Sequence, residues 1–160
     1  MLVSTKGRYA LRLAIYIASS SPDEPVALKS VAQAEDISIK YSEQLARALV
    51  KGNVLKSVRG FGGGYTLARD PRRITAGDIL RAVQGEHSVI GCTGLDGECE
   101  RMHVCSIISF MRGLEAAVID YVDSVTLYQL VQEQTLAHLS KFFKGDQELH
   151  EEVPEAKPQA

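Results

Sequence analysis

The sequence predicts a mainly α-helical fold with one small β-hairpin. Apolar residues recur at helical spacing before residue 52 and again after residue 106, and a glycine-rich loop near residue 60 separates two short strand-like stretches. The chain has 160 residues, of which 45% are hydrophobic, enough for the core of one domain with an extension. We therefore expect one folded domain over residues 1–84 and a helical extension after it.

The first expected helix covers residues 4–20. Ser4 can cap its N-terminus, and Pro22 and Pro25 interrupt the chain after its end. Its apolar positions recur every four residues: Tyr9, Leu13 and Ile17.

A helix-turn-helix motif is expected next. Residues 28–35 have the pattern of a short helix, and residues 36–37 form a turn. Ser38 can cap a second helix over residues 39–51, which residues 52–53 end. The two helices and their short connection have the proportions of this motif.

A β-hairpin with a glycine-rich loop should follow. Residues 54–59 alternate like a half-buried strand, and residues 65–68 are its expected partner. Four of the five residues 60–64 are glycine, so the backbone there can approach a phosphate or a groove floor closely. Arg59 lies at the base of this wing, where a guanidinium can enter a minor groove. A nucleotide-binding loop is disfavoured because no Gly-Lys-Ser/Thr follows.

Thr75 and Asp78 form an expected capping box for a helix that ends near Gln84. Residues 104–135 are expected to form a long dimerisation helix and a shorter C-terminal helix that Thr126 caps. We expect residues 144–160 to be a disordered acidic tail. The apolar stripe of the long helix has heptad-like steps: Ile107, Met111, Leu114, Val118, Tyr121 and Val125.

The charges are unevenly distributed along the chain. Residues 1–75 contain twelve Lys or Arg and six Asp or Glu, whereas residues 76–160 contain six and fourteen. The first part is thus +6 and the second −8, within a net charge of −2. A basic first part can neutralise phosphates, and an acidic second part should face away from DNA.

Three cysteines lie close together in an expected loop over residues 85–106. A shared metal needs thiolates brought together by a short, pliable segment. The N-terminus lacks the apolar run of a signal peptide, and no segment is apolar enough to cross a membrane, so we expect a cytoplasmic protein without a membrane partner. An odd number of thiols in a reducing compartment favours metal or redox chemistry over structural disulfides. The cysteines are Cys92, Cys99 and Cys105.

These motifs together resemble the winged-helix regulators of the iron-sulfur-cluster regulator type, the family of IscR, NsrR, RirA and CymR. The resemblance covers about residues 1–135 and includes the three cysteines. It implies a cytoplasmic homodimer that binds a double-stranded DNA operator and is not an enzyme. The segments that carry it are Thr5-Lys6-Gly7-Arg8-Tyr9-Ala10-Leu11, Ser38-Ile39-Lys40-Tyr41-Ser42-Glu43-Gln44-Leu45 and Ser57-Val58-Arg59-Gly60-Phe61-Gly62-Gly63-Gly64-Tyr65.

The resemblance also implies which residues contact DNA. The helix after Ser38 should enter the major groove with its leading turn, because such helices contact bases mainly through N-terminal residues. Gln44 can pair with adenine and Glu43 with a cytosine amine. Arg59 and Gly60 of the wing should meet the minor groove. The expected contacts on the helix are Ser38, Lys40, Tyr41, Glu43 and Gln44.

In the family, the three cysteines hold an iron-sulfur cluster, of either the 2Fe-2S or the 4Fe-4S type here. One branch uses a His three residues after the last cysteine, but this chain has Ile108 there. Another takes a carboxylate from the partner's first helix, where this chain offers Tyr9. The fourth ligand therefore stays open among His103, Tyr9, Glu98, Glu100 and an exogenous group.

Two other functions compete with a cluster-sensing repressor or activator. A zinc- or thiol-redox-responsive regulator would use the same DNA reader without a cluster. A cluster carrier would use the helix-turn-helix for protein contacts, which the basic first part and the glycine-rich wing disfavour. An enzyme acting on a small organic substrate is the least expected class, since the sequence contains no Ser/His/Asp arrangement, paired carboxylates or nucleotide signature. The signal stays open among iron supply, oxygen and nitric oxide.

Overall fold

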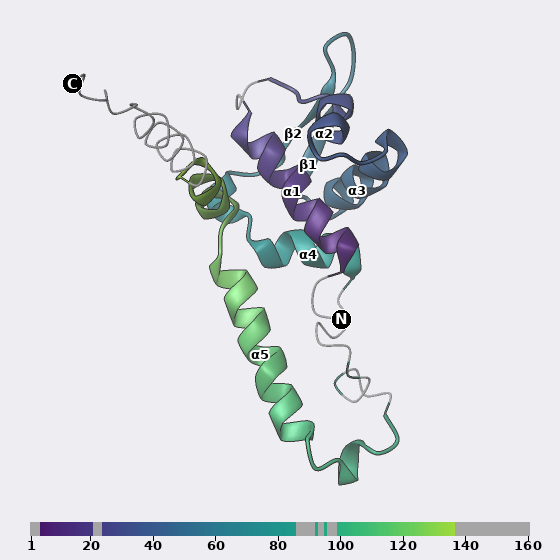
Figure 1. Ribbon diagram of the computed structural model, residues 1–160, viewed down its shortest axis with the longest axis vertical. Coiled ribbons are helices and arrows are strands. Elements are labelled where there is room, and N and C mark those ends of the chain that lie inside the picture. The colour runs from purple at the N-terminus through teal and green to yellow at the C-terminus, as the bar shows by residue number, and fades with distance from the viewer. Residues whose placement is uncertain (1–3, 21–23, 86–91, 93–94, 96–98, 137–160) are drawn as a thin grey trace, which may run out of the picture.

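The computed structural model has the predicted mainly α-helical fold with a two-stranded hairpin (Figure 1). It describes residues 4–20, 24–85, 92, 95 and 99–136. The predicted tail, residues 144–160, and part of the predicted loop, residues 85–106, lie outside the described residues. The elements are α1 (Thr5–Ser19), α2 (Leu28–Ala34), α3 (Ile39–Lys51), β1 (Leu55–Val58), β2 (Gly64–Leu67), η1 (Pro71–Arg73), α4 (Ala76–Gln84), η2 (Met102–Val104) and α5 (Ile108–Ser124).

Side-chain caps begin the helices where the sequence predicts them. The Ser4 hydroxyl accepts from Gly7 N at 3.1 Å to begin α1, and the Ser38 hydroxyl accepts from Tyr41 N at 3.1 Å to begin α3. Thr75 and Asp78 form both hydrogen bonds of a capping box at the start of α4. Each of these bonds satisfies a backbone N–H that has no partner within its own helix, which fixes the helix starts.

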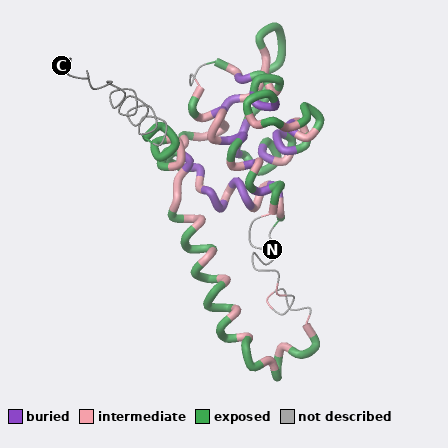
Figure 2. Tube along the Cα trace, in the orientation of Figure 1, coloured by how far each residue is buried: buried purple, intermediate pink, exposed green. Residues whose placement is uncertain are grey.

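The core lies between α1, α3, α4 and the base of the hairpin. Figure 2 shows that the buried residues gather in this upper lobe, whereas α5 extends away from it and contains no buried residue. A short helix over residues 127–136 returns to the lobe, with Leu127 fully buried. The large core side chains include Leu13, Leu45, Leu49, Leu55, Ile74 and Ile79.

The hairpin differs from the predicted half-buried strand. β1 and β2 pair antiparallel, with Leu55 opposite Leu67 and Val58 opposite Gly64. Only Leu55 of β1 is buried, and Val58 is 38% exposed, so burial does not alternate along the strand. The hairpin is held at its base, where Val26 and Tyr65 exchange two backbone hydrogen bonds of 2.9 Å and Thr66 is buried, whereas its exposed loop residues 59–62 project beyond the domain (Figure 1). Its outer half is thus free to contact another molecule.

The C-terminal end of α5 is fixed to the domain. Ala76 N donates to Val125 O at 2.9 Å, and Leu127 N donates to Ile74 O at 2.8 Å. Thr126 and Gln129 cap the following helix reciprocally, since Thr126 N donates to Gln129 Oε1 at 2.8 Å and Gln129 N donates to the Thr126 hydroxyl at 3.3 Å.

Within the described residues, no helix has the length and apolar character needed to cross a bilayer.

Gly77 permits the close packing of α4 against the end of α5. A Cβ at Gly77 would overlap Asp123 Oδ1 and would lie 3.0 Å from Arg81 Nη1. We expect Gly77→Ala to lower the free energy of unfolding by about 1–3 kcal/mol, because the methyl group forces Asp123 away from Arg81. Urea unfolding followed by circular dichroism measures this.

Gly113 provides the control for that substitution, because it is also inside a helix but a Cβ added there would meet no atom within 4 Å. Gly113→Ala should raise the free energy of unfolding by about 0.5–1 kcal/mol, the usual gain for this change in a helix. Equal effects of the two substitutions would contradict the packing role of Gly77.

Candidate nucleic-acid interface and cysteine site

The leading turn of α3 is exposed, as expected for a helix that enters a groove. Asp36 has a positive φ of 51°, which turns the chain between α2 and α3, and Ile37 N donates to Ala32 O at 3.0 Å. Ser38 and Lys40 are exposed directly after this turn. The start of α3, residues 38–40, is therefore exposed, whereas Tyr41 and Ser42 in the same turn face the domain.

The predicted contacts on α3 differ in how available they are. Lys40 and Gln44 are exposed, whereas Tyr41 is partly buried and packs edge-on against Tyr9, with ring centroids 6.0 Å apart at 86°. Glu43 accepts from Arg47 Nη2 at 3.3 Å. The Tyr41 ring thus positions α3 on α1, and the ion pair restricts Glu43. Lys40 and Gln44 are the better placed of the four for base contact.

A basic face of α3 extends beyond the contacts predicted from the sequence. Lys40, Gln44, Arg47 and Lys51 are all exposed and follow one another at steps of four, three and four residues, which places them on one side of the helix. The prediction covered only the leading turn and so missed Arg47 and Lys51. Their helical spacing from Lys40 is the signal that identifies them.

The wing places Arg59 and Gly60 at the outer end of the hairpin, and both are exposed. Gly60 has φ 107°, and Gly62 has φ 77°, a region that side chains other than glycine rarely adopt. Gly63 N donates to Gly60 O at 3.0 Å and closes the loop as a tight turn. The glycines are therefore required by the backbone of the wing.

Two arginines and two carboxylates connect residues 1–84, here called the reader, to α5. Arg69 donates to Asn53 O at 3.1 Å, next to the end of α3, and to Asp78 Oδ2 at 2.9 Å. Arg81 lies 3.3 Å from Asp78 Oδ1 and 2.8 Å from Asp123 Oδ1 on α5. This series of contacts, here called the arginine relay, joins the end of α3 to the end of α5.

Asp78 of the arginine relay makes the free energy of unfolding depend on pH in the acid range. Burial raises the pKa of Asp78, but the bond from Thr75 N and the pairing with Arg69 and Arg81 outweigh it, so the pKa lies below 3.8. A lowered pKa stabilises the fold above pH 3.8, and this contribution disappears as the pH falls through the folded-state value. Asp78→Ala should cost about 1–2 kcal/mol at pH 7, and the difference from wild type should shrink below pH 4. Urea titrations at both pH values measure this, with exposed Glu133→Ala as the control.

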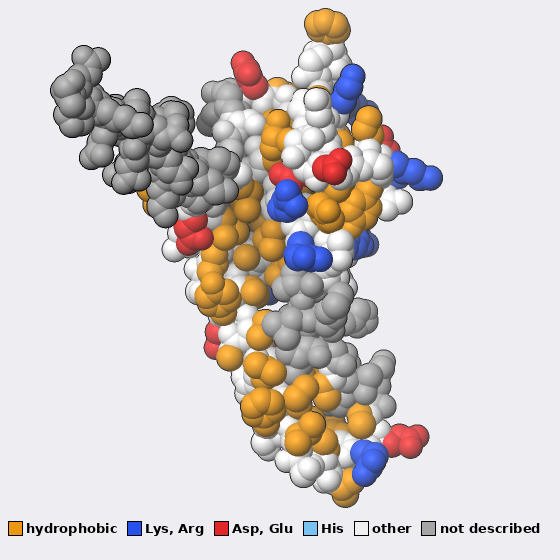
Figure 3. Space-filling view, viewed as in Figure 1, with side chains coloured by type: hydrophobic (Ala, Val, Ile, Leu, Met, Phe, Trp, Pro, Cys, Tyr) orange, Lys and Arg blue, Asp and Glu red, His pale blue; other side chains and the backbone are white. Residues whose placement is uncertain are grey.

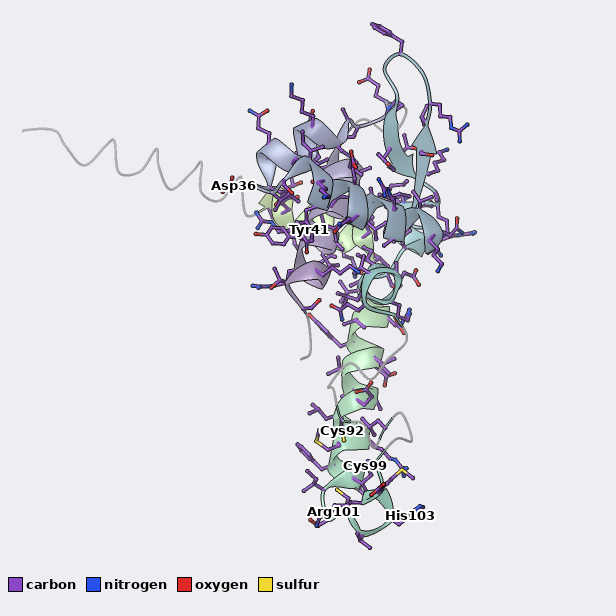
Figure 4. The ribbon with its side chains drawn as sticks, turned by 90° about the vertical axis from the view of Figure 1, so that its right-hand side faces the viewer. Asp36, Tyr41, Cys92, Cys99, Arg101 and His103 are labelled. Carbon is purple, nitrogen blue, oxygen red and sulfur yellow. The ribbon has the colours of Figure 1, made fainter. Side chains whose placement is uncertain are left out.

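The three cysteines lie at the end of the molecule opposite the hairpin. Figure 4 shows Cys92 and Cys99 beside the N-terminal end of α5, with His103 and Arg101 nearby. All three thiols are free and partly exposed. Ile108 N donates to Cys105 O at 3.3 Å, so Cys105 directly precedes the first turn of α5. Cys105 is therefore connected directly to the start of α5.

The chemistry of these donors fits a metal-sulfur centre. Three thiols supply soft anionic ligands, which suit iron-sulfur clusters and zinc. In the part of the chain that the structure describes, no three His, Cys, Asp or Glu side chains come together as a metal site. The thiols share one end of the molecule without converging on a common point.

The candidates for a fourth ligand are separated by the fold. His103 is exposed within η2, and Glu100 is exposed just before it. Glu98 lies outside the described residues. Tyr9 packs against Tyr41 in the reader, far from the cysteines of its own chain (Figure 4). Within one chain, His103 and Glu100 are the described candidates that lie near the thiols.

Comparison with known proteins agrees with this arrangement. The family model Rrf2, described as iron-dependent transcriptional regulator, matches residues 3–133. The HTH-type transcriptional regulator IscR of Klebsiella pneumoniae (strain 342) is 33% identical over 159 residues, 99% of this chain and 94% of that protein. Among solved structures, CymR (YrzC), the global cysteine regulator of B. subtilis, is 36% identical with a TM-score of 0.68, over 83% of this chain and 98% of that one. T. potens IscR is 33% identical with a TM-score of 0.65, over 84% and 88%.

The winged helix-turn-helix fold with its exposed basic helix defines a DNA-binding transcriptional regulator. The chain belongs to the Rrf2 family of iron-dependent transcriptional regulators. The family predicted from the motifs is therefore confirmed, and the relatives are regulators of transcription, not enzymes.

Proposed function

We propose that this protein is a homodimer that binds operator DNA and senses the state of an iron-sulfur cluster held by Cys92, Cys99 and Cys105. One observation carries the proposal. The three thiols lie at one end of α5, and the other end of α5 is bonded to the reader through Asp123 and Arg81. A change at the cysteines thus acts on a helix that directly contacts the DNA-binding domain.

The reader is residues 1–84. α3 enters the major groove, with Lys40 and Gln44 reaching base edges and Ser38 near the backbone, while Tyr41 and Glu43 hold the leading turn in position. Arg59 and Gly60 of the wing contact the adjacent minor groove. These assignments are supported by the exposure of α3 and of the wing on the same molecule, and by the absence of acidic residues from residues 54–69.

α5, which lies within the predicted dimerisation segment 104–135, forms the interface of the homodimer. Its exposed apolar residues follow heptad steps of three and four, and such a face is unstable in water unless another helix covers it. Figure 3 shows hydrophobic side chains gathered over α5. Of the predicted stripe, Met111 and Val118 are partly buried and Val125 follows the end of α5. The exposed stripe is Ile107, Phe110, Leu114, Ala117 and Tyr121.

The cluster would be ligated by the three thiolates of the segment 85–106, and His103 and Glu100 are the described candidates for a fourth ligand on the same chain. When bound, it supplies a centre whose loss or oxidation alters the ligating thiolates. The residues of the chain then carry the change from the cysteines to the DNA-binding domain. Ordering the cysteine segment sets the position of α5, and the arginine relay transmits that position to Asn53 at the end of α3. The coupling is limited to about 1–3 kcal/mol, as is usual between linked sites.

Anaerobic purification tests the cofactor directly. We expect a coloured protein with iron and sulfide in equal amounts, and native mass spectrometry should show one cluster for each subunit of a dimer. Gel shifts on duplexes selected from a random library should differ between the cluster-bound and cluster-free protein. A colourless protein without iron, or equal operator affinity in both states, would contradict the proposal.

A second candidate is a zinc- or thiol-responsive regulator with the same reader. The likeness to the global cysteine regulator CymR favours it, and three partly exposed thiols that do not converge favour its thiol-responsive form. Stoichiometric zinc after anaerobic purification would support it. So would operator binding that changes on treatment with peroxide and recovers with dithiothreitol.

A further inference from the structure

A single aromatic side chain occupies the tip of the wing. Phe61 is the one residue with a side chain between Arg59 and Tyr65, because residue 60 and residues 62–64 are glycine. Its relative exposure is 113%, so it makes no packing contact with its own domain. Figure 3 shows hydrophobic atoms at the outermost point of the hairpin loop. An aromatic ring is thus presented to solvent at the end of a projecting arm.

The loop holds this ring in a defined place. The bond from Gly63 N to Gly60 O, 3.0 Å long, closes a turn in which Phe61 is the second residue. A Cβ at Gly63 would lie 2.5 Å from Val58 O and 2.9 Å from Gly60 O, so the backbone folds tightly on itself. The turn thus places Phe61 at its outer side, where a partner can bury the ring without breaking contacts to its own domain.

The surroundings of the ring suit nucleic acid, which carries anionic phosphates on its outside and stacked apolar bases inside. Residues 54–69 contain Lys56, Arg59 and Arg69 and no acidic residue. Arg59 is exposed two positions before Phe61, and its guanidinium can lie at the mouth of the minor groove beside the phosphates while the ring goes deeper. A protein pocket or a lipid surface could also take the ring, but the ring lies on a cationic hairpin of the same domain that presents the exposed basic face of α3, which favours DNA.

Those glycines fit a narrow groove. The minor groove of B-DNA is about 6 Å wide, and a backbone without side chains can enter it where a bulkier loop cannot. Apolar side chains that reach the minor groove insert between base pairs and partly unstack them. We propose that Phe61 is a wedge that enters the minor groove of the operator and partly unstacks one base step in each half-site.

This inference rests on the proposed DNA-binding function and adds a source of sequence preference. Pyrimidine–purine steps such as TA and CA unstack more easily than others, so a wedge favours them at positions that no side chain reads by hydrogen bonding. Phe61 would therefore select a flexible step at the wing, while α3 selects bases in the major groove. Arg59 anchors the wing but does not set this preference.

The test uses the full-length dimer and duplexes that the wild type selects from a random library. 2-Aminopurine, placed at successive positions in the minor-groove segment, reports unstacking as increased fluorescence. The variants are Phe61→Ala and Phe61→Leu. Val58→Ala is the matched control, since Val58 is an exposed apolar residue of the same hairpin, away from its tip.

We expect wild type to raise the fluorescence at one step per half-site, and Phe61→Ala to abolish that signal and weaken binding on the order of tenfold. Phe61→Leu should keep part of both effects, and Val58→Ala should match wild type. A library reselected with Phe61→Ala should lose its preference for TA or CA at that step. Circular dichroism and dimer mass should be unchanged in all variants.

Two results separate the wedge from the function on which it rests. If wild type binds a selected duplex and Phe61→Ala binds it equally well with unchanged fluorescence, the wedge is wrong, and the ring belongs to a protein contact. If wild type selects no duplex even at low salt, the DNA-binding function fails and the wedge fails with it. Arg59→Ala should weaken binding to every duplex without changing the preferred step.

Discussion

Replacing Leu114 and Tyr121 with Glu should convert the protein to a monomer. Both residues lie on the exposed apolar stripe of α5, where they are 37% and 69% exposed, and a partner helix that covers them would have to bury four carboxylates. Because two linked readers gain about 10²–10⁴ in affinity from avidity, operator binding should fall by at least a hundredfold. Light scattering measures the mass, and gel shifts measure the affinity.

The matched control places the same charges on the other side of the helix. Residues 109 and 116 lie about 120–140° around α5 from the centre of the stripe, since successive residues are about 100° apart. Ser109→Glu combined with Ala116→Glu should leave a dimer with wild-type affinity for DNA. If both double variants behave alike, α5 does not dimerise through this stripe.

Replacing Cys92, Cys99 and Cys105 with Ala should remove all bound iron and all visible absorbance. The three thiols are the cysteines of the chain, and no carboxylate or imidazole set among the described residues can hold a metal in their place. The protein should still dimerise, because the stripe on α5 is untouched. Operator affinity should become independent of oxygen and of iron supply. Absorbance, iron analysis and anaerobic gel shifts measure the three effects.

Single substitutions then separate the candidate fourth ligands. His103→Ala should accelerate cluster loss on exposure to air if the imidazole is a ligand, and Glu100→Ala should do so if the carboxylate is. Arg101→Ala is the control, because this exposed neighbour cannot ligate iron. A triple cysteine variant that keeps its iron and its response would remove the cysteine segment from the mechanism. Zinc in the wild type that disappears from the triple variant would support the second candidate function.

Local signals made the helices of the reader predictable. Ser4, Ser38 and Thr75 are followed by apolar positions at helical spacing, and a cap acts within three residues of itself. The wing was equally predictable in its glycines, because positive φ at Gly62 is a property of the local turn. The burial of β1 was not predictable, since it depends on how far the core extends beneath the hairpin.

The candidate site was predictable in composition but not in arrangement. The spacing of the cysteines identified their chemistry, and the sequence placed Tyr41 among the DNA contacts. Only the packing of α1 against α3 shows that Tyr41 is held edge-on by Tyr9. The exposure of Phe61 likewise follows from the hairpin projecting beyond the domain, since the same residue in a covered loop would be part of the core.

By itself, the sequence determined where the capped helices α1, α3 and α4 begin, which residues are cationic and which thiols are available, because these depend on neighbours a few positions apart. The tertiary structure decided that residues 125–127 return to the base of α4, and that Arg69, Asp78, Arg81 and Asp123 meet there. Contacts between residues more than 40 positions apart are set by how the whole core packs, and no local pattern in the sequence encodes them. The connection between the cysteine end and the reader is therefore a property of the fold.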